Sequence, residues 1–99
     1  MSELSPEDTK LVTLAKAARA RVGAAEGAAV RDGDGRSYTG VTVARPSFAV
    51  SALQLAVANA VAAGASTLES AVVVTPDGEV DSSPVSDLTP GAPLIVVAP

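Results

Sequence analysis

The stretch from residue 48 to residue 63 constrains the fold of this chain more than any other. It reads FAVSALQLAVANAVAA, with few polar positions. Ser47 before it can cap a helix and Gly64 can end one, so we predict a helix from about Phe48 to Ala63. A helix that is apolar on nearly all sides is not stable with most of its circumference in water. We therefore expect a layered fold in which a sheet covers one side of this helix and another subunit covers part of the rest.

A second, amphipathic helix is predicted from about Pro6 to Val22. Ser5 can accept a hydrogen bond as its N-cap, Pro6 suits the first helical position, and Gly23 can end it. Apolar residues at helical spacing would form one stripe facing a core. That stripe consists of Leu11, Leu14, Ala15, Ala18 and Val22.

Two strand-like segments lie between these helices. Residues 27–31 and 36–44 flank a cluster of Gly and Asp at 32–35, which predicts a β-hairpin. Pro46 stops the strand pattern. After the apolar helix, residues 71–74 read AVVV, a continuous apolar run typical of a buried central strand.

The remaining chain predicts a turn at 76–78, a short strand at 79–80, a loop and a last strand at 94–97. The whole order is α-β-β-α-β-(β)-loop-β. It predicts a single α/β domain that spans residues 1–99.

Charge and composition exclude several classes of partner. The net charge is −4, and every Lys and Arg lies at or before Arg45. An acidic second half would be repelled by phosphate backbones, and the few aromatic residues offer little for base stacking, so we expect no nucleic-acid partner. The apolar stretch 48–63 is short for a membrane span, and no signal peptide is recognisable, so we expect no membrane partner and a cytoplasmic location.

The chain contains no Cys and no His, which removes the usual groups for nucleophilic catalysis and metal binding. Lys10 and Lys16 could serve as bases in principle, but a solvated helix face explains them more simply. Asp32 and Asp34 beside glycines are weakly similar to a calcium loop, but the EF-hand spacing fails. A hairpin turn is the better interpretation of these acids.

Several segments together resemble the cytidine deaminase family, which has the pattern VGAA…DGR-x-YTG followed by VENASY before its catalytic helix. The resemblance covers roughly residues 11–78. It implies a cytidine deaminase-like three-layer α/β/α fold with a mixed sheet, shortened here at its C-terminal end. The matching segments are EGAAV at 26–30, DGRSYTG at 34–40, VARPSF at 43–48, AVVV at 71–74 and PDG at 76–78.

The resemblance also implies where a catalytic site would lie. In this family, a (C/H)AE motif at the start of the second helix supplies a zinc ligand and a proton-shuttling Glu, and a PCxxC motif supplies two further ligands. Here Leu53, Gln54 and Leu55 stand at the (C/H)AE positions, and Val85 and Leu88 at the two Cys positions. The helix that follows would be missing or very short because Pro90 comes soon after.

Three further family positions are substituted. Thr42 and Ala44 stand where the family has its ribose-binding Asn and Glu, and Phe48 ends the segment that replaces VENASY. The zinc expected for the family therefore could not be bound, and we expect no cofactor. Eight degenerate site positions result: Thr42, Ala44, Phe48, Leu53, Gln54, Leu55, Val85 and Leu88.

Two functions remain open from the sequence. The first is a catalytically inactive homologue that acts as an oligomeric scaffold or protein-interaction domain. The resemblance implies a homodimer or homotetramer through helix 48–63, and a different protein partner is also open. The alternative is a module that binds a nucleoside or nucleobase without converting it. An active deaminase is the least favoured reading, because the motif positions hold neither a zinc ligand nor a proton-shuttling Glu to activate the attacking water.

Overall fold

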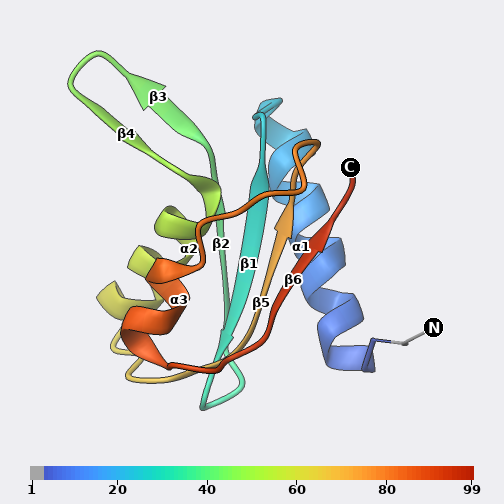
Figure 1. Ribbon diagram of the computed structural model, residues 1–99, viewed down its shortest axis with the longest axis vertical. Helices are drawn as coiled ribbons and strands as arrows, with labels where there is room; N and C mark the ends of the chain where they lie inside the picture. Colours follow the sequence, from blue (N-terminus) through green and yellow to red (C-terminus); the bar gives the residue numbers. More distant parts are fainter. Residues whose placement is uncertain (1–3) are drawn as a thin grey trace.

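The computed structural model describes residues 4–99, which form one sheet between two helical layers and a separate small hairpin (Figure 1). This confirms the expected three-layer α/β/α architecture with a mixed sheet. None of the helices in this described part is long and apolar enough to cross a membrane. The elements are α1 (Pro6–Val22), β1 (Gly27–Asp32), β2 (Ser37–Val41), β3 (Val43–Arg45), β4 (Phe48–Val50), α2 (Ala52–Ala62), β5 (Leu68–Val74), α3 (Ser83–Leu88) and β6 (Leu94–Val97).

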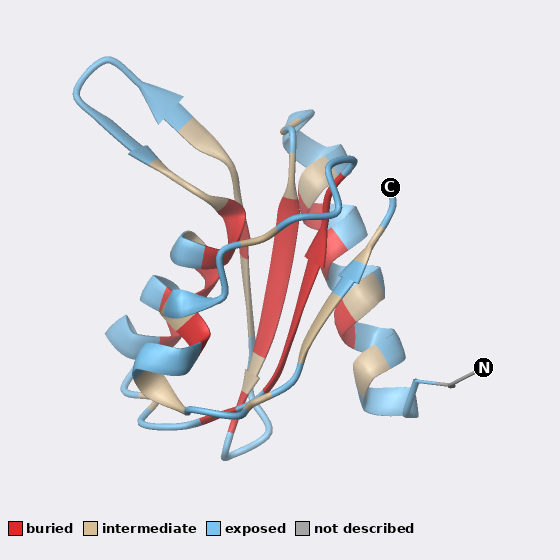
Figure 2. Ribbon diagram, in the orientation of Figure 1, coloured by how far each residue is buried: buried red, intermediate tan, exposed pale blue. Residues whose placement is uncertain are grey.

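The main sheet has the strand order β2-β1-β5-β6. β1 pairs antiparallel with both β2 and β5, whereas β5 and β6 are parallel. The two central strands are almost wholly buried, as their small aliphatic residues require (Figure 2). β1 and β5 therefore form the rigid centre on which both helical layers pack.

α1 covers one face of this sheet. Leu11 and Ala15 of α1 pack with Val72 and Val74 of β5 in one buried cluster. The helix approaches the sheet closely at Gly27, where a Cβ atom would clash with the carbonyl oxygen of Ala15. A glycine at the start of β1 is therefore what allows α1 to lie against the strand.

α2 and α3 cover the opposite face, and the larger core cluster lies beneath them. Alternate residues of the central strands, such as Val30 and Val73, point to this side. α2 approaches β2 at Gly40, where a Cβ atom would clash with backbone atoms of Ala52 and Ala56. The apolar helix is therefore covered on one side by the sheet, as its composition predicts.

The predicted start of this helix was wrong. α2 begins at Ala52 with Ser51 as its N-cap, rather than at Phe48 with Ser47 as the cap. Residues 48–50 instead form β4, which pairs antiparallel with β3 across the turn at Pro46 and Ser47. The aromatic and β-branched residues of this segment suit a strand, and Ser51 is followed by a better capping partner.

Other boundaries also differ from the sequence prediction. The predicted strand 36–44 divides at Thr42, whose backbone N–H donates to the carbonyl oxygen of Glu26 outside the main ladder. β5 begins at Leu68, earlier than predicted. Residues 79–80 form no strand, and Val80 instead packs as a partly buried residue against the core.

Candidate functional site

The start of α2 is where the family resemblance places the reactive motif. The Ser51 hydroxyl accepts a hydrogen bond from the Gln54 backbone N–H at 3.0 Å. In return, the Gln54 side-chain oxygen accepts one from the Ser51 backbone N–H at 2.8 Å. This is a complete capping box, so the side chain of Gln54 contributes to helix initiation. It lies on the exposed side of α2.

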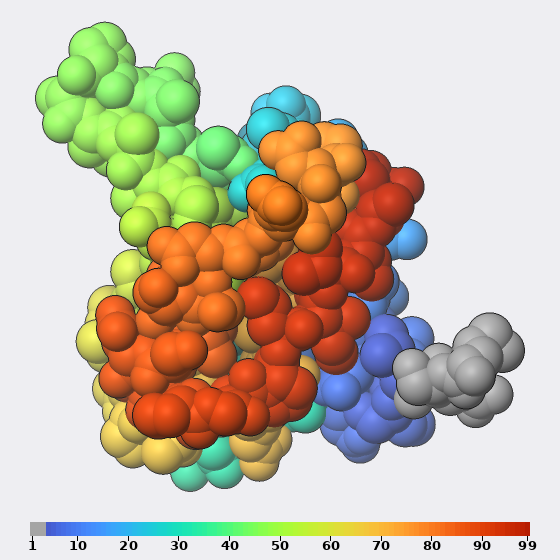
Figure 3. Space-filling model, in the orientation of Figure 1, coloured from blue at the N-terminus to red at the C-terminus, as the bar shows by residue number. Residues whose placement is uncertain are grey.

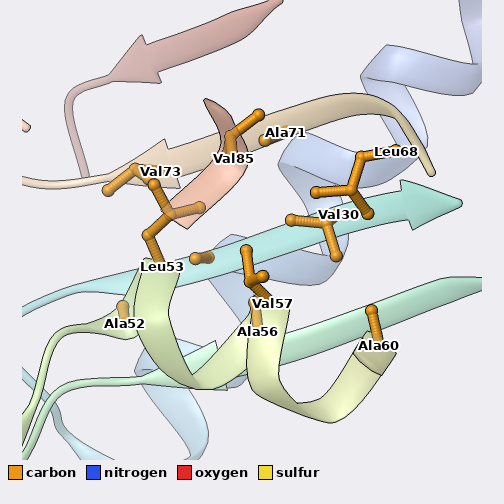
Figure 4. Packing of buried hydrophobic residues seen from close by; sticks show 11 residues of the cluster. Val30, Ala52, Leu53, Ala56, Val57, Ala60, Leu68, Ala71, Val73 and Val85 are labelled. Atoms are coloured by element: carbon orange, nitrogen blue, oxygen red, sulfur yellow. The ribbon is translucent and has the colours of Figure 1, made fainter. Parts of the chain in front are cut away.

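Leu53, which precedes Gln54 in the first turn of α2, is buried, with only 1% of its surface exposed. It belongs to the same apolar cluster as Val85 of α3, which is 2% exposed, and as Val73 of β5. Leu88, one turn after Val85, is partly buried against this cluster. Figure 4 shows Leu53, Val73 and Val85 beside one another between α2, β5 and α3. The three positions that the resemblance aligns with the family's zinc ligands therefore lie together.

This cluster does not fit a metal ion. Leucine and valine side chains carry no atom that can donate an electron pair to zinc, which takes nitrogen, sulfur or oxygen ligands. Residues 4–99 also hold no group of three or more Asp or Glu side chains placed to bind a metal elsewhere. The place where the resemblance puts a polar metal site is packed with hydrocarbon side chains, and this packing stabilises the fold.

Leu55 and Phe48 lie outside this cluster. Leu55 is half-buried, and its Cβ lies over Gly40 of β2. Phe48 is in the projecting β3–β4 hairpin, and 58% of its surface is exposed. The structure therefore places Leu55, the third of the (C/H)AE positions, and Phe48 apart from Leu53 and Val85.

Thr42 and Ala44 occupy a second location. They line a groove of about 370 Å³ together with residues 22–24 at the end of α1, and this groove shares no residue with the apolar cluster. The Thr42 hydroxyl accepts a hydrogen bond from the Glu26 backbone N–H at 3.0 Å, so it is already engaged. Ala44 is exposed and offers no polar side-chain atom.

Two polar residues near Thr42 were missed as site residues in the sequence. Glu26 immediately precedes β1, and its carboxylate accepts a hydrogen bond from the Thr75 hydroxyl at 2.8 Å. Thr75 is 2% exposed and also accepts a hydrogen bond from the Asp77 backbone N–H. Their hydrogen bonds connect the start of β1 with the ends of β2 and β5. Because Glu26 and Thr75 are far apart in the sequence, no local sequence pattern predicts their contact.

The Asp32 region is a turn, as the sequence favours. Its carboxylate accepts hydrogen bonds from the backbone N–H groups of Asp34 and Arg36, both at 2.9 Å, and from the Tyr38 hydroxyl at 3.1 Å. Burial alone would raise the pKa of the Asp32 carboxyl, but these hydrogen bonds outweigh it and hold the pKa below its usual value. The side chain therefore closes the β1–β2 turn.

The sheet order, the two helical layers and the site at the start of α2 together define a three-layer α/β/α domain with a hydrocarbon-filled centre. The family model described as cytidine deaminase-like matches residues 4–99. The chain belongs to the cytidine deaminase-like family. No functionally curated protein matches the sequence.

Solved structures of cytidine deaminases are similar to this chain. The enzyme from Burkholderia pseudomallei is 25% identical, with a TM-score of 0.64, over 79% of this chain and 68% of that one. The enzyme from Mycobacterium leprae superposes with a TM-score of 0.72 at 24% identity, over 97% of this chain and 90% of that one. The second likeness bears on the fold alone, and it extends over nearly the whole domain.

Proposed function

We propose that this chain is a catalytically inactive member of its family that acts as an oligomeric scaffold. The observation that carries the proposal is the apolar cluster of Leu53, Val85 and Leu88, which the resemblance aligns with the family's zinc ligands. Hydrocarbon side chains at these positions can neither hold a metal ion nor carry a proton, so this cluster has no group that could activate a water molecule. The proposal includes a cytoplasmic location, which a chain without Cys favours.

Support for the scaffold role comes from the surface of α2. Ala58, Val61 and Ala62 lie on the side of the helix that faces away from the sheet, and Val61 is 50% exposed. A single apolar side chain in water is ordinary, but a helix with no charged residue on its outer side favours contact with another protein. A second copy of the chain is the proposed partner, as a dimer or a tetramer.

The proposed loss of activity can be tested by introducing metal-binding side chains at these three positions. In the triple variant Leu53→Cys, Val85→Cys, Leu88→Cys, three thiols would replace the hydrocarbon side chains where α2 meets α3. We expect this variant to bind Co²⁺ with the absorption bands of thiolate coordination, and the native chain to show none. The matched control places three Cys at exposed positions on separate parts of the chain, Ala20, Ser47 and Ser66.

The same experiment includes an activity measurement. The native chain, incubated with Zn²⁺ and cytidine, should leave the ultraviolet absorbance of cytidine unchanged. Deamination by the native chain would refute the proposal. Failure of the triple variant to bind Co²⁺, while it still folds by circular dichroism, would show that the three positions do not correspond to the family's ligands.

The groove beside Thr42 and Ala44 favours one second candidate, a module that binds a nucleoside without converting it. The groove, of about 370 Å³, is large enough for a small ligand. NMR titration of the labelled chain with cytidine, deoxycytidine and uridine tests this. Saturable shifts around Thr42 would support nucleoside binding, and a flat response at millimolar ligand would exclude it.

A further inference from the structure

β6 is one of the two edge strands of the main sheet (Figure 1). Within residues 4–99, its only strand partner is β5. The C=O groups of Pro93 and Val97 accept hydrogen bonds from N–H groups in and just after β5, both at 3.0 Å. Because successive residues of a strand direct their backbone groups to opposite sides, the N–H and C=O groups of Leu94 and Val96 point away from β5. β6 therefore presents a free hydrogen-bonding edge at these two residues.

The two edges of the sheet differ in how they are protected. At the β2 edge, the side-chain amide of Asn59 in α2 donates a hydrogen bond to the C=O of Thr39 at 2.8 Å. At the β6 edge, charged side chains are absent, because no Lys, Arg, Asp or Glu follows Asp87. Pro93 directs its backbone toward β5, so its missing N–H does not block the free edge. An uncharged and uncovered edge of this kind favours pairing with a further strand.

An open hollow lies beside this edge, on the face of the sheet that α2 and α3 cover. Its volume is about 650 Å³, and it is lined by Val96 of β6 and by residues 78–81, which follow β5. Figure 3 shows these two segments side by side on the surface. Directly paired residues of neighbouring antiparallel strands share a face. A residue that pairs with Val96 from an added strand would therefore place its side chain in this hollow.

The hollow is acidic, since its charged lining residues are Glu79 and Asp81. Ser83 donates two hydrogen bonds to the Asp81 carboxylate, from its hydroxyl at 2.6 Å and from its backbone N–H at 2.9 Å. These hydrogen bonds lower the pKa of Asp81 and keep it ionised. Within residues 4–99, neither carboxylate of the hollow forms an ion pair. A cationic side chain on the added strand would complement both.

These charges favour a segment of another protein over a second copy of this chain. Two copies joined at β6 would bring two acidic hollows to one sheet, and residues 46–99 contain no Lys or Arg to balance them. An extended segment with Lys or Arg at alternate positions would place its charges beside Glu79 and Asp81, while the aliphatic stems cover Val80 and Val96. Such strand addition gains affinity from main-chain hydrogen bonds and specificity from alternate side chains.

We propose that β6 binds an extended, basic segment of another protein as an additional antiparallel strand. The backbone groups of Leu94 and Val96 pair with this segment, and its Lys or Arg side chains lie beside Glu79 and Asp81. The antiparallel direction follows from the greater stability of antiparallel pairs. This inference goes beyond the proposed scaffold and does not depend on oligomerisation.

A synthetic peptide that alternates Lys and Val over seven residues, capped at both ends, serves as the probe. The labelled chain is titrated with this peptide and followed by NMR. We expect saturable shifts at Leu94 and Val96, and hydrogen exchange of their N–H groups that is slower by at least about tenfold. The same peptide with Glu in place of every Lys is the control for charge, and it should not bind.

N-methylated peptides separate backbone pairing from charge attraction. With the Lys side chains on the same face as Val96, the Lys N–H groups of an antiparallel strand point toward β6 and the Val N–H groups point away. Methylation of the Lys nitrogens should therefore abolish binding. Methylation of the Val nitrogens is the matched control and should preserve it. Any result in which the two methylated peptides behave alike would overturn the proposal.

Variants of the chain test the same contact from the other side. Val96→Pro removes an N–H that the sheet does not use, and it should abolish binding of the Lys peptide. Glu79→Lys should weaken binding at least about tenfold, whereas Asp87→Lys, at an exposed acid outside the hollow, should change it less than about twofold. Circular dichroism checks that each variant folds. Glu79→Lys decides the question if Val96→Pro does not fold.

Two further results would overturn the proposal. The absence of saturable shifts with the Lys peptide up to millimolar concentration would show that the edge does not bind a basic strand. Slower exchange at Leu94 and Val96 when the concentration of the chain alone is raised would identify a second copy as the occupant. Neither result bears on the proposed loss of catalytic activity, which the metal-binding variant tests separately.

Discussion

Leu53 lies at the point where α2, β5 and α3 meet, and its side chain is almost fully buried. We expect Leu53→Ala to lower the free energy of unfolding by about 2–5 kcal/mol, because it removes buried surface and leaves a cavity. Val61→Ala, on the half-exposed side of the same helix, should cost less than about 1 kcal/mol. Urea unfolding of the three proteins measures both values. Equal effects would contradict the placement of Leu53 in the core.

Asp32 is the residue whose protonation should affect stability most clearly. Hydrogen bonds from two backbone N–H groups and from Tyr38 hold its pKa below the ordinary value of 3.8. A carboxyl with a lowered pKa in the folded state stabilises the fold above its unfolded-state pKa, and this contribution is lost as pH falls through the folded-state value. Native chain and Asp32→Asn should therefore differ in stability at neutral pH and converge in acid, as pH falls through the lowered pKa of the folded state.

Urea unfolding between pH 7 and pH 2 measures this convergence. Asp34→Asn is the matched control, because the Asp34 side chain is exposed in the same turn. A stability difference between the native chain and Asp32→Asn that stays constant over the range would contradict the expected role of the Asp32 carboxylate.

Among the elements, the start of α2 shows what the sequence could and could not predict. Ser47 and Ser51 both precede apolar residues, but only Ser51 is followed three residues later by Gln54, the sequence sign of a capping box. The correct start was therefore readable from the sequence. The β3–β4 hairpin was harder to predict, because a proline such as Pro46 is typical of the end of a strand as well as of the turn of a hairpin.

The same elements show which parts of the candidate site could be predicted from the sequence. Resemblance to a family located Leu53, Val85 and Leu88, and the structure brings these three into one cluster. It could not predict the contact between Glu26 and Thr75, because this hydrogen bond joins residues 49 positions apart. The resemblance also grouped Thr42 with Leu53, whereas the folded chain places Thr42 in a separate groove.

The two candidate caps of α2 make a matched pair of variants. Ser51→Ala should lower the free energy of unfolding by about 0.5–2 kcal/mol, because the first turn loses its N-cap. Ser47→Ala, in the exposed turn of the β3–β4 hairpin, should change the free energy of unfolding by less than about 0.5 kcal/mol. Chemical denaturation at a protein concentration that keeps the chain in one oligomeric state measures both. The reverse order would restore Ser47 as the helix cap.

For the molecule as a whole, small aliphatic residues build a thin but continuous core. β1 and β5 are buried on both faces by helices whose approach depends on Gly27 and Gly40. Both helical layers leave apolar surface exposed, with Leu14 and Val22 on α1 and a groove between α2 and α3 and the β3–β4 hairpin on the other side. This exposed apolar surface is what the proposed assembly would cover.

A stability measurement on the whole chain tests that assembly. If folding is coupled to association, mass action makes the unfolding temperature rise with protein concentration. Over a hundredfold increase in concentration we expect a rise of about 5 °C or more for a dimer of this size. Calorimetry at several concentrations measures it, with Phe48→Ala as the comparison. The dependence should weaken in that variant if Phe48 lies in the contact, because loss of this large exposed apolar side chain would weaken the proposed assembly. An unfolding temperature that is independent of concentration in the native chain would mean that folding is not coupled to association.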